Sequence, residues 1–323
     1  PGWLAFRRMK VTAGWKSGRR KNTGVIMVSE VSRLAISFSG GESSAVMSML
    51  CLKHFAETHE IRSIFMNTGC EHEETLRFVN DCDQHIFGGS LVWLEAVING
   101  SGVGPTAKVV TYETAARNGE PFAAAVAKHG VFGPSHPQCN SRLKTEPMLW
   151  YRKQTGWAPG TYDTAIGIRA DEIDRASENA KRDRIVYPLI SFGIRKPDVK
   201  RIMSKFDWRL KLPGEHYGNC VWCWKKTLRK HLTLAKDNPA IFDFPAAMEG
   251  QYGHVNNGQQ EQIQARTFFR NRKSAKDIVE MAQQVDFEPW QDRSHLPGLF
   301  DDQFDADLDV GGGCGDSCEI GAD

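Results

Sequence analysis

Along most of the chain, short stretches of alternating apolar and polar residues are followed by stretches in which apolar residues recur at helical spacing. The predicted elements, in chain order, are a strand at 34–38, a helix at 46–55, a strand at 61–66, a helix at 75–79, a strand at 91–97, a helix at 112–129, a strand at 164–168, an extended segment at 186–190 and a helix at 198–206. Such alternation favours a parallel sheet that is covered on both faces and binds ligands at the carboxyl ends of its strands. The sequence therefore predicts an α/β fold.

The chain beyond this region changes character twice. Residues 225–284 are mostly of helical period, and from Asp286 the sequence becomes acidic and aperiodic. No internal repeat is present in the sequence. The predicted organisation is a basic, disordered leader at 1–30, an α/β nucleotide-binding domain at 31–210, a helical region at 211–285 and an acidic tail containing glycine and cysteine at 286–323.

Composition excludes several classes of protein. Of the 323 residues, 41% are hydrophobic and 25% are charged, which rules out collagen-like, coiled-coil and wholly disordered proteins. No run approaches the ~18 apolar residues that cross a bilayer, and the first thirty residues lack the apolar core of a secretion signal. We therefore expect a soluble, cytoplasmic protein with no membrane partner.

The small net charge of +2 hides an uneven distribution. Residues 1–29 hold seven Lys and Arg and no Asp or Glu, so the rest of the chain has 34 basic against 39 acidic residues. A leader of this kind is a disordered extension, a stretch upstream of the true start, or an arm that contacts nucleic acid. Nucleic acid therefore stays open as a partner.

The sharpest chemical signal is the sequence Ser-Gly-Gly-Glu-Ser-Ser at residues 39–44, between the first predicted strand and helix. Two glycines allow a tight turn, and the helix that follows presents free N–H groups and the positive end of its dipole to an anion. The segment is not a Walker loop, because Gly-Lys-Ser/Thr is absent. The candidate phosphate ligands are Ser39, Gly40, Gly41, Ser43 and Ser44, and the alternative is a glycine turn without a ligand.

Residues 39–44 resemble the Ser-Gly-Gly-x-Asp/Thr-Ser motif of the PP-loop superfamily, whose members are ATP pyrophosphatases or sulfonucleotide-binding enzymes. Glu42 stands where that motif commonly has lysine or arginine, and Ser43 stands where it has aspartate or threonine. Both departures argue against tight binding of ATP.

Three later segments resemble, in order, motifs of the phosphoadenosine phosphosulfate (PAPS) reductase-like branch of that superfamily, a type often carried by phages. Residues 68–75 resemble its Thr-Gly-x-x-x-x-Glu-Thr signature, residues 167–175 its Gly-x-Arg-x-x-Glu-x-x-Arg element, and residues 187–199 its Pro-Leu…Asp-Val element. The resemblance covers about residues 33–285. It implies a Rossmann-like parallel sheet of the adenine nucleotide α-hydrolase type with a mainly helical C-terminal region.

The resemblance also implies further nucleotide-binding residues, which are Thr68, Gly69, Glu74, Gly167, Arg169 and Arg175. The two guanidinium groups suit phosphate or sulfate. The alternatives are a carboxylate favoured by the helix dipole for Glu74 and a surface ion pair for Arg175. The implied ligand is ATP with Mg²⁺, or else PAPS or adenylylsulfate (APS).

Eight cysteines are few for a disulfide scaffold of this length, and clustered cysteines in a reducing compartment more often hold metal or do redox chemistry. Cys139 lies in a segment that resembles the family's Cys-x-x-x-x-Lys-x-x-Pro, and its distance from the Cys220-Val-Trp-Cys223 sequence resembles the spacing in iron–sulfur adenylylsulfate reductases. The resemblance implies three thiolate ligands of a [4Fe–4S] cluster, in which one iron is left open or a fourth ligand comes from Cys314 or Cys318. Structural zinc and plain reduced cysteines stay open.

The remaining cysteines are Cys51 and Cys82, which we assign to packing, and Cys70, which lies beside the expected nucleotide and is left undecided.

Two reactions are open for such an enzyme. In the first, ATP is split between its α- and β-phosphates to adenylate a substrate, which sulfur from a donor then attacks. Ser39 would help to bind the pyrophosphate, and Arg169 would stabilise the charge of the transferred group. In the second, Cys318 attacks the sulfur of a sulfonucleotide and releases sulfite, with a thioredoxin-like reductant as partner. The tail lacks the Glu-Cys-Gly-x-His ending of those reductases, which favours the first reaction.

A hypothesis from a different class is a non-catalytic nucleotide- or DNA-associated module whose helical region is held by zinc. Glu42 in the anion-binding loop and the basic leader motivate it.

Overall fold

A computed structural model describes residues 31–255, 264–284 and 286–291. The predicted leader and most of the predicted tail, with Cys314 and Cys318, lie outside the described residues. The described residues from Ser32 onward form one compact unit.

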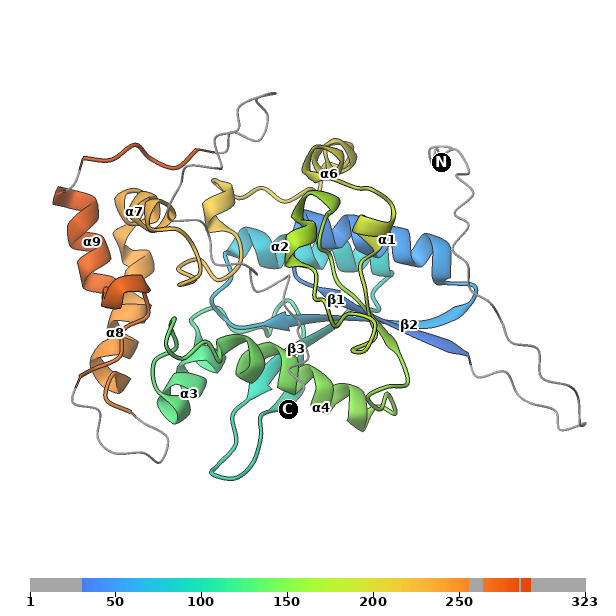
Figure 1. The fold of residues 1–323 in the computed structure, drawn as a ribbon, viewed down its shortest axis with the longest axis horizontal. Helices are drawn as coiled ribbons and strands as arrows, with labels where there is room; N and C mark the ends of the chain where they lie inside the picture. The colour runs from blue at the N-terminus through green and yellow to red at the C-terminus, as the bar shows by residue number, and fades with distance from the viewer. Residues whose placement is uncertain (1–30, 256–263, 285, 292–323) are drawn as a thin grey trace, which may run out of the picture. The chain divides into compact units, whose positions relative to one another are not determined.

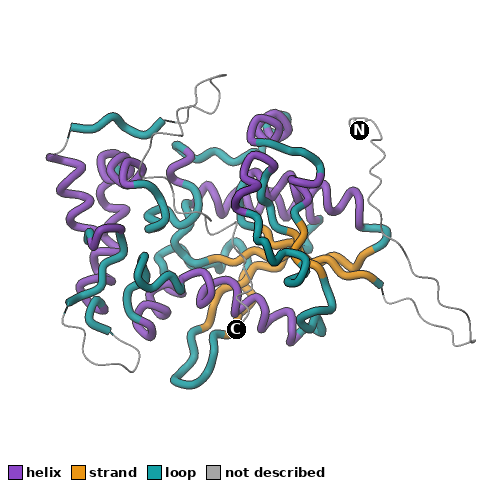
Figure 2. The backbone as a smooth tube through the Cα atoms, in the orientation of Figure 1, coloured by secondary structure: helices purple, strands orange, loops and turns teal. Residues whose placement is uncertain are grey.

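The described part of the chain contains a six-stranded sheet in the order β4-β3-β2-β1-β5-β6 (Figures 1 and 2). Its strands are β1 (Ser32–Phe38), β2 (His59–Asn67), β3 (Val92–Val97), β4 (Thr106–Val110), β5 (Asp163–Ala165) and β6 (Ile185–Val186). All neighbours are parallel except β3 and β4. Because the chain leaves β1 first toward β2 and later returns to β5 on its other side, the order of strands reverses at β1, where α/β proteins bind ligands.

Helices cover both faces of this sheet (Figure 1). On one face lie α1 (Glu42–Phe55), α2 (Glu73–Cys82) and α6 (Lys196–Met203), and on the other α3 (Glu120–His129) and α4 (Glu146–Gln154). The predicted α/β class, with a mostly parallel sheet, is confirmed.

Alternate residues of the strands supply the two cores. Phe65 and Trp93 are buried against α1 and α2, whereas Ile64 and Leu94 are buried with Met148 of α4. The period of two along each strand therefore places apolar side chains on both faces, as a doubly covered sheet requires.

The C-terminal part is helical, as predicted. It contains α7 (Leu228–Asp237), α8 (Asp243–Tyr252) and α9 (Ala275–Gln284), which share an apolar cluster with α3 and with the segment around Trp222. Phe122 and Phe268 each pack edge to face on Trp222 in this cluster, with ring centroids 4.9 and 5.0 Å apart.

Two predicted elements differ from the observed ones. The helix predicted at 112–129 begins only at Glu120, and β4, which was not predicted, precedes it as an antiparallel edge strand. The alternation of apolar and polar positions is weak in β4, because Val109 is exposed. Lys108 of the same strand pairs with the buried Glu95 of β3 at 2.9 Å.

The second difference is at the segment predicted to be extended over 186–190. Only Ile185–Val186 is a strand, and Pro188 opens the four-residue helix α5 (Pro188–Ser191). Proline suits the first turn of a helix, because its missing N–H is one that the helix leaves unpaired there.

The carboxylate of Glu249 in α8 holds two neighbouring segments. Its Oε1 accepts a hydrogen bond from the N–H of Phe268 and its Oε2 one from the N–H of Ala275, both at 2.8 Å. Burial raises the pKa of this carboxyl to about 7, and it outweighs the two hydrogen bonds, which lower the pKa.

We predict that Glu249 makes the protein less stable as the pH rises from about 5 to 7. The pKa of Glu249 is higher in the folded than in the unfolded state, so the folded state binds more protons in this interval. The stabilisation that this proton binding gives is fully present below the unfolded pKa and is lost as the pH rises through about 7. The free energy of unfolding of Glu249→Gln, measured by urea titration across this range, should lack this decrease with rising pH. Parallel pH profiles of the two proteins would contradict the prediction.

Candidate functional site

The turn between β1 and α1 is held by its own hydroxyl groups. Ser44 is buried, donates to the carbonyl of Gly41 at 2.8 Å, and accepts hydrogen bonds from the N–H and the hydroxyl of Ser39 at 3.3 and 3.1 Å. These bonds occupy the Ser44 hydroxyl within the turn. Ser43, which is partly exposed, is the serine placed at the surface of the helix start.

Gly40 lets this turn pack against α2. Its φ is +80°, and a Cβ built there would lie 3.0 Å from methyl carbons of Thr75 and Val79 and 3.2 Å from the ring of Phe65. Thr75 therefore brings the predicted 68–75 motif against the 39–44 turn. Its hydroxyl is buried without a hydrogen-bond partner among the described residues.

The first N–H groups of α1 have no side-chain cap. Gly41 is the N-cap and supplies no side chain for them. Unpaired N–H groups at a helix start carry partial positive charge and attract anions. The role predicted for residues 39–44 in binding phosphate stays a prediction.

The loop after β5 brings Arg169 to this helix start. Gly167 lies so close to α1 that a Cβ on it would be 3.2 Å from the Cα of Ser44. The guanidinium of Arg169 then donates to the hydroxyl of Ser43 at 3.2 Å. Two segments 126 residues apart are thereby joined at the point where the order of strands reverses.

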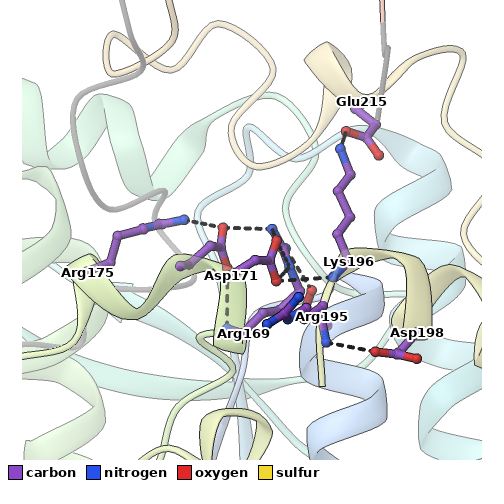
Figure 3. Close-up of polar contacts among 9 residues, drawn as sticks. Arg169, Asp171, Arg175, Arg195, Lys196, Asp198 and Glu215 are labelled. Carbon is purple, nitrogen blue, oxygen red and sulfur yellow. Dashed lines mark hydrogen bonds and ion pairs between the residues drawn. The ribbon is translucent and has the colours of Figure 1, made fainter. Parts of the chain in front are cut away.

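Carboxylates hold both predicted arginines (Figure 3). Arg169 pairs with Asp171 at 3.2 Å and with Glu172 at 3.0 Å, and Arg175 pairs with the same Glu172 oxygen at 2.7 Å. Lys196 joins the network through two groups. Its backbone N–H donates a hydrogen bond to Asp171 at 3.1 Å, and its side-chain ammonium group donates one to Glu215 at 2.8 Å. An anionic ligand would have to exchange with these carboxylates to reach the arginines.

Lys200 of α6 supplies a cation beside the turn that the sequence analysis missed. Its ammonium group lies 3.3 Å from Glu42 and 3.0 Å from Glu215. Burial lowers the pKa of Lys200, but the two carboxylates outweigh that effect, so the pKa is raised. The position where the PP-loop motif has a basic residue is thus occupied by Glu42, and a lysine from another element sits against it.

A pocket of about 640 Å³ lies on this side of the turn. Four basic residues line it beside Glu42, and these are Lys200, Arg201, Arg209 and Lys211. The surroundings of residues 39–44 are therefore rich in positive charge, although the chain beyond the leader is acidic overall.

The turn after β2 is closed by Glu71. Its carboxylate accepts hydrogen bonds from the N–H groups of Thr68 and Cys70 at 3.0 and 3.2 Å and from the Thr68 hydroxyl at 2.8 Å. Gly69, with φ +78°, packs so tightly that a Cβ on it would lie 3.0 Å from the backbone nitrogen of Gly119. Thr68 and Gly69 thus shape the carboxyl end of β2, as the motif predicts.

Glu74 has the position expected for its alternative role, a carboxylate at a helix start, and it also has a local ion-pair partner. It lies in the first turn of α2 and pairs with Arg77, one turn along the same helix, at 2.5 Å. The structure does not bring its side chain into the contacts that join residues 39–44 to Arg169.

Four cysteines lie in one apolar cluster, and these are Cys70, Cys139, Cys220 and Cys223. Each is buried, and Cys51 and Cys82 are buried in the separate core between the sheet and α1. Burial raises the pKa of Cys70 well above its usual range, and nearby Glu71 raises it further, whereas the hydrogen bond with Thr68 and the charge of Lys144 lower it.

The geometry of these thiols is not that of a single-ion site. Across the described ranges, no three His, Cys, Asp or Glu side chains are grouped so as to hold a metal ion. The tail cysteines Cys314 and Cys318, predicted to complete a metal site or to attack a sulfonucleotide, lie outside those ranges.

Comparison with known proteins gives two matches. Residues 33–102 match the family model of the phosphoadenosine phosphosulfate reductase domain. Over 290 residues the chain is 30% identical to the uncharacterized nin region protein ORF290 of Escherichia phage lambda, and the alignment covers 88% of this chain and 94% of the phage protein. The first match spans β1 to β3 and includes residues 39–44 and 68–75.

Within the described residues, every helix is too short or too polar to cross a membrane.

We predict that Gly40→Ala lowers the free energy of unfolding by about 2–4 kcal/mol, since it combines an unfavourable φ with crowding against Thr75 and Val79. Gly89→Ala is the matched control, because Gly89 has the same φ of +80° and open space around it, and should cost only about 1 kcal/mol. Urea unfolding measures both, and equal losses would show that packing at residue 40 is not the constraint.

Proposed function

This chain belongs to the phosphoadenosine phosphosulfate reductase-like family, and we propose that it is a PP-loop enzyme that binds an adenine nucleotide at residues 39–44 and cleaves ATP between the α- and β-phosphates. The observation that carries the proposal is the contact between Arg169 and Ser43 at the start of α1. It joins a cation to a helix start at the point where the strand order reverses, the usual position of a nucleotide in such sheets.

The chain's own groups have distinct roles in this proposal. The N–H groups at the start of α1 and the hydroxyl of Ser43 would bind the phosphates, with Mg²⁺ bound to the nucleotide. Arg169 would leave Asp171 and Glu172 to stabilise the charge that develops at the α-phosphorus. A nucleophilic oxygen of the acceptor attacks that phosphorus, the α–β bond breaks, and pyrophosphate leaves with its electron pair. A sulfur nucleophile from a donor then displaces AMP from the adenylated acceptor.

Three buried cysteines fit a further part of the proposal. Cys139, Cys220 and Cys223 have the chemistry of thiolate ligands, and we assign them to an iron–sulfur cluster close to the carboxyl end of β2. Such a cluster, when bound, would place iron and sulfide close to the proposed nucleotide site. A phage-encoded protein of this kind would act in the host cytoplasm.

The test of the reaction follows the products of labelled nucleotides. AMP and pyrophosphate from ATP, formed in equal amounts, would support the proposal. Sulfite from PAPS or APS, with no AMP from ATP, would instead support the sulfonucleotide reductase. Nucleotide binding without turnover of ATP, PAPS or APS would leave the non-catalytic module as the function.

We predict that Arg169→Gln weakens ATP binding by about 10- to 100-fold, because charge-assisted hydrogen bonds contribute about 1.5–3 kcal/mol. Arg182→Gln is the control, since Arg182 also pairs with a carboxylate, that of Asp183 at 2.8 Å, but is 60% exposed outside this network. Isothermal titration calorimetry measures both affinities. Equal affinities in the two variants would remove Arg169 from the nucleotide site.

A further inference from the structure

We propose that Cys70 is the fourth protein ligand of the cysteine site, so that Cys70, Cys139, Cys220 and Cys223 together hold the iron–sulfur cluster. The inference rests on the proposed function, which assigns a cluster to three of these residues, and it replaces the tail cysteines as the source of the fourth thiolate.

Cys70 and Cys220 lie on two segments that are paired with each other. Glu71 and Cys220 form an antiparallel β-bridge, and the N–H of Val221 donates to the carbonyl of Cys70 at 2.9 Å. The hydroxyl of Thr68 lies 3.4 Å from the sulfur of Cys220 and 3.4 Å from the backbone nitrogen of Cys70. The segments that carry the two cysteines are therefore fixed side by side, 150 residues apart in sequence.

The Cys220–Cys223 loop is held in a tight turn. The N–H of Cys223 donates to the carbonyl of Cys220 at 3.0 Å, and the ammonium group of buried Lys226 donates to the carbonyls of His216, Cys220 and Val221 at 2.5 to 3.1 Å. A turn of this kind directs two thiols from one short loop, as Cys-x-x-Cys ligand pairs require.

Cys139 belongs to the segment that carries Lys144. This lysine is buried, and Cys139 itself is buried in the same apolar cluster as Cys70, Cys220 and Cys223. A buried positive charge in this segment would offset the negative charge of a cluster with thiolate ligands.

The four cysteines are 4 to 8% exposed and lie in a cluster that also contains buried aromatic side chains. Trp222 and Trp224 flank Cys223 in the chain and are both 4% exposed, and Trp222 stacks on Phe244 with ring centroids 5.7 Å apart. The indole N–H of Trp224 is buried without a hydrogen-bond acceptor among the described residues. A buried N–H without an acceptor costs about 1–3 kcal/mol, and cluster sulfur would provide one.

The grouping of side chains argues against a single ion. Four sulfurs around one zinc ion lie about 4 Å apart, as follows from Zn–S bonds of ~2.3 Å. Among the described residues, no three His, Cys, Asp or Glu side chains are grouped so as to hold one metal ion. Ligands of a [4Fe–4S] cluster bind different corners of a cube and lie farther apart, which suits four thiols that share a buried region without meeting at one point. Four protein ligands would also leave no iron open to an external group.

The experiment uses the full chain, reconstituted anaerobically with iron and sulfide. The wild-type protein should hold about four iron and four sulfide per chain and absorb near ~400 nm. Cys70→Ala should lose this absorbance as completely as Cys220→Ala does. Cys51→Ala, a buried cysteine in the other core, and the double variant Cys314→Ala/Cys318→Ala should keep it.

Cys70→Ser is the second variant, in case the alanine protein does not fold. An oxygen ligand in place of sulfur should change the electron paramagnetic resonance spectrum of the reduced cluster, while Cys51→Ser leaves that spectrum unchanged. Full iron content in Cys70→Ala, an unchanged spectrum in Cys70→Ser, or loss of iron in the tail double variant would overturn the assignment of Cys70.

The iron measurement separates this inference from the proposed function. If wild-type protein holds iron and Cys70→Ala holds as much, only the fourth ligand is wrong. If wild-type protein holds zinc without iron, or neither metal, the cluster assignment fails as a whole. Release of AMP and pyrophosphate from ATP tests the nucleotide reaction independently of either result.

Discussion

The chain can pass from β1 into α1 only through a residue that adopts a left-handed conformation and has no side chain. Gly40 meets both conditions, and the absence of a Cβ lets Thr75, Val79 and Phe65 close around the turn. That contact sets the position of the helix start relative to β2 and α2. The start of α1 thereby comes to lie at the carboxyl end of β1, between the neighbouring strands β2 and β5.

The basic side chains at this edge of the sheet are paired with carboxylates. Arg169, Arg175 and Lys200 all contact carboxylates, on residues 171, 172, 42 and 215. Each pair keeps a cation ordered in the absence of a ligand, and an arriving phosphate has to offer a better partner than a carboxylate. Because phosphate carries more charge and more acceptor oxygens than a carboxylate, such an exchange would favour a polyanion over a monovalent anion in the proposed site.

One cysteine of the apolar cluster and the turn at residues 39–44 lie near the same edge of the sheet. Thr68 directly follows β2, which pairs with β1, and its hydroxyl lies 3.4 Å from the sulfur of Cys220 in the C-terminal region. A nucleotide at the start of α1 and a thiolate site beyond β2 would therefore be neighbours. The C-terminal region would contribute to the proposed site as well as to the fold, because it supplies two of the four cysteines in this apolar cluster.

The alternation of strands and helices, the glycine turn at 39–44 and the arginine at 169 could be predicted from sequence because each is a local pattern: a period, a dipeptide with a special conformation, or a motif. Strand β4 and the start of α3 could not, since an edge strand with an exposed valine has no clear period and depends on pairing with β3. The helical turn at Pro188 was missed for a similar reason, because proline is compatible with both an extended segment and a first helical turn.

The sequence by itself determined the chemistry that is available: serine hydroxyls, a helix start, guanidinium groups and eight cysteines. Only the tertiary structure decided which of these groups meet. It put Lys200 against Glu42, paired the Cys70 turn with the Cys220 loop and gave Glu74 a local partner in Arg77. The physical reason is that such contacts join residues tens to hundreds of positions apart, and their geometry follows from strand order and packing, which no local pattern of residues encodes.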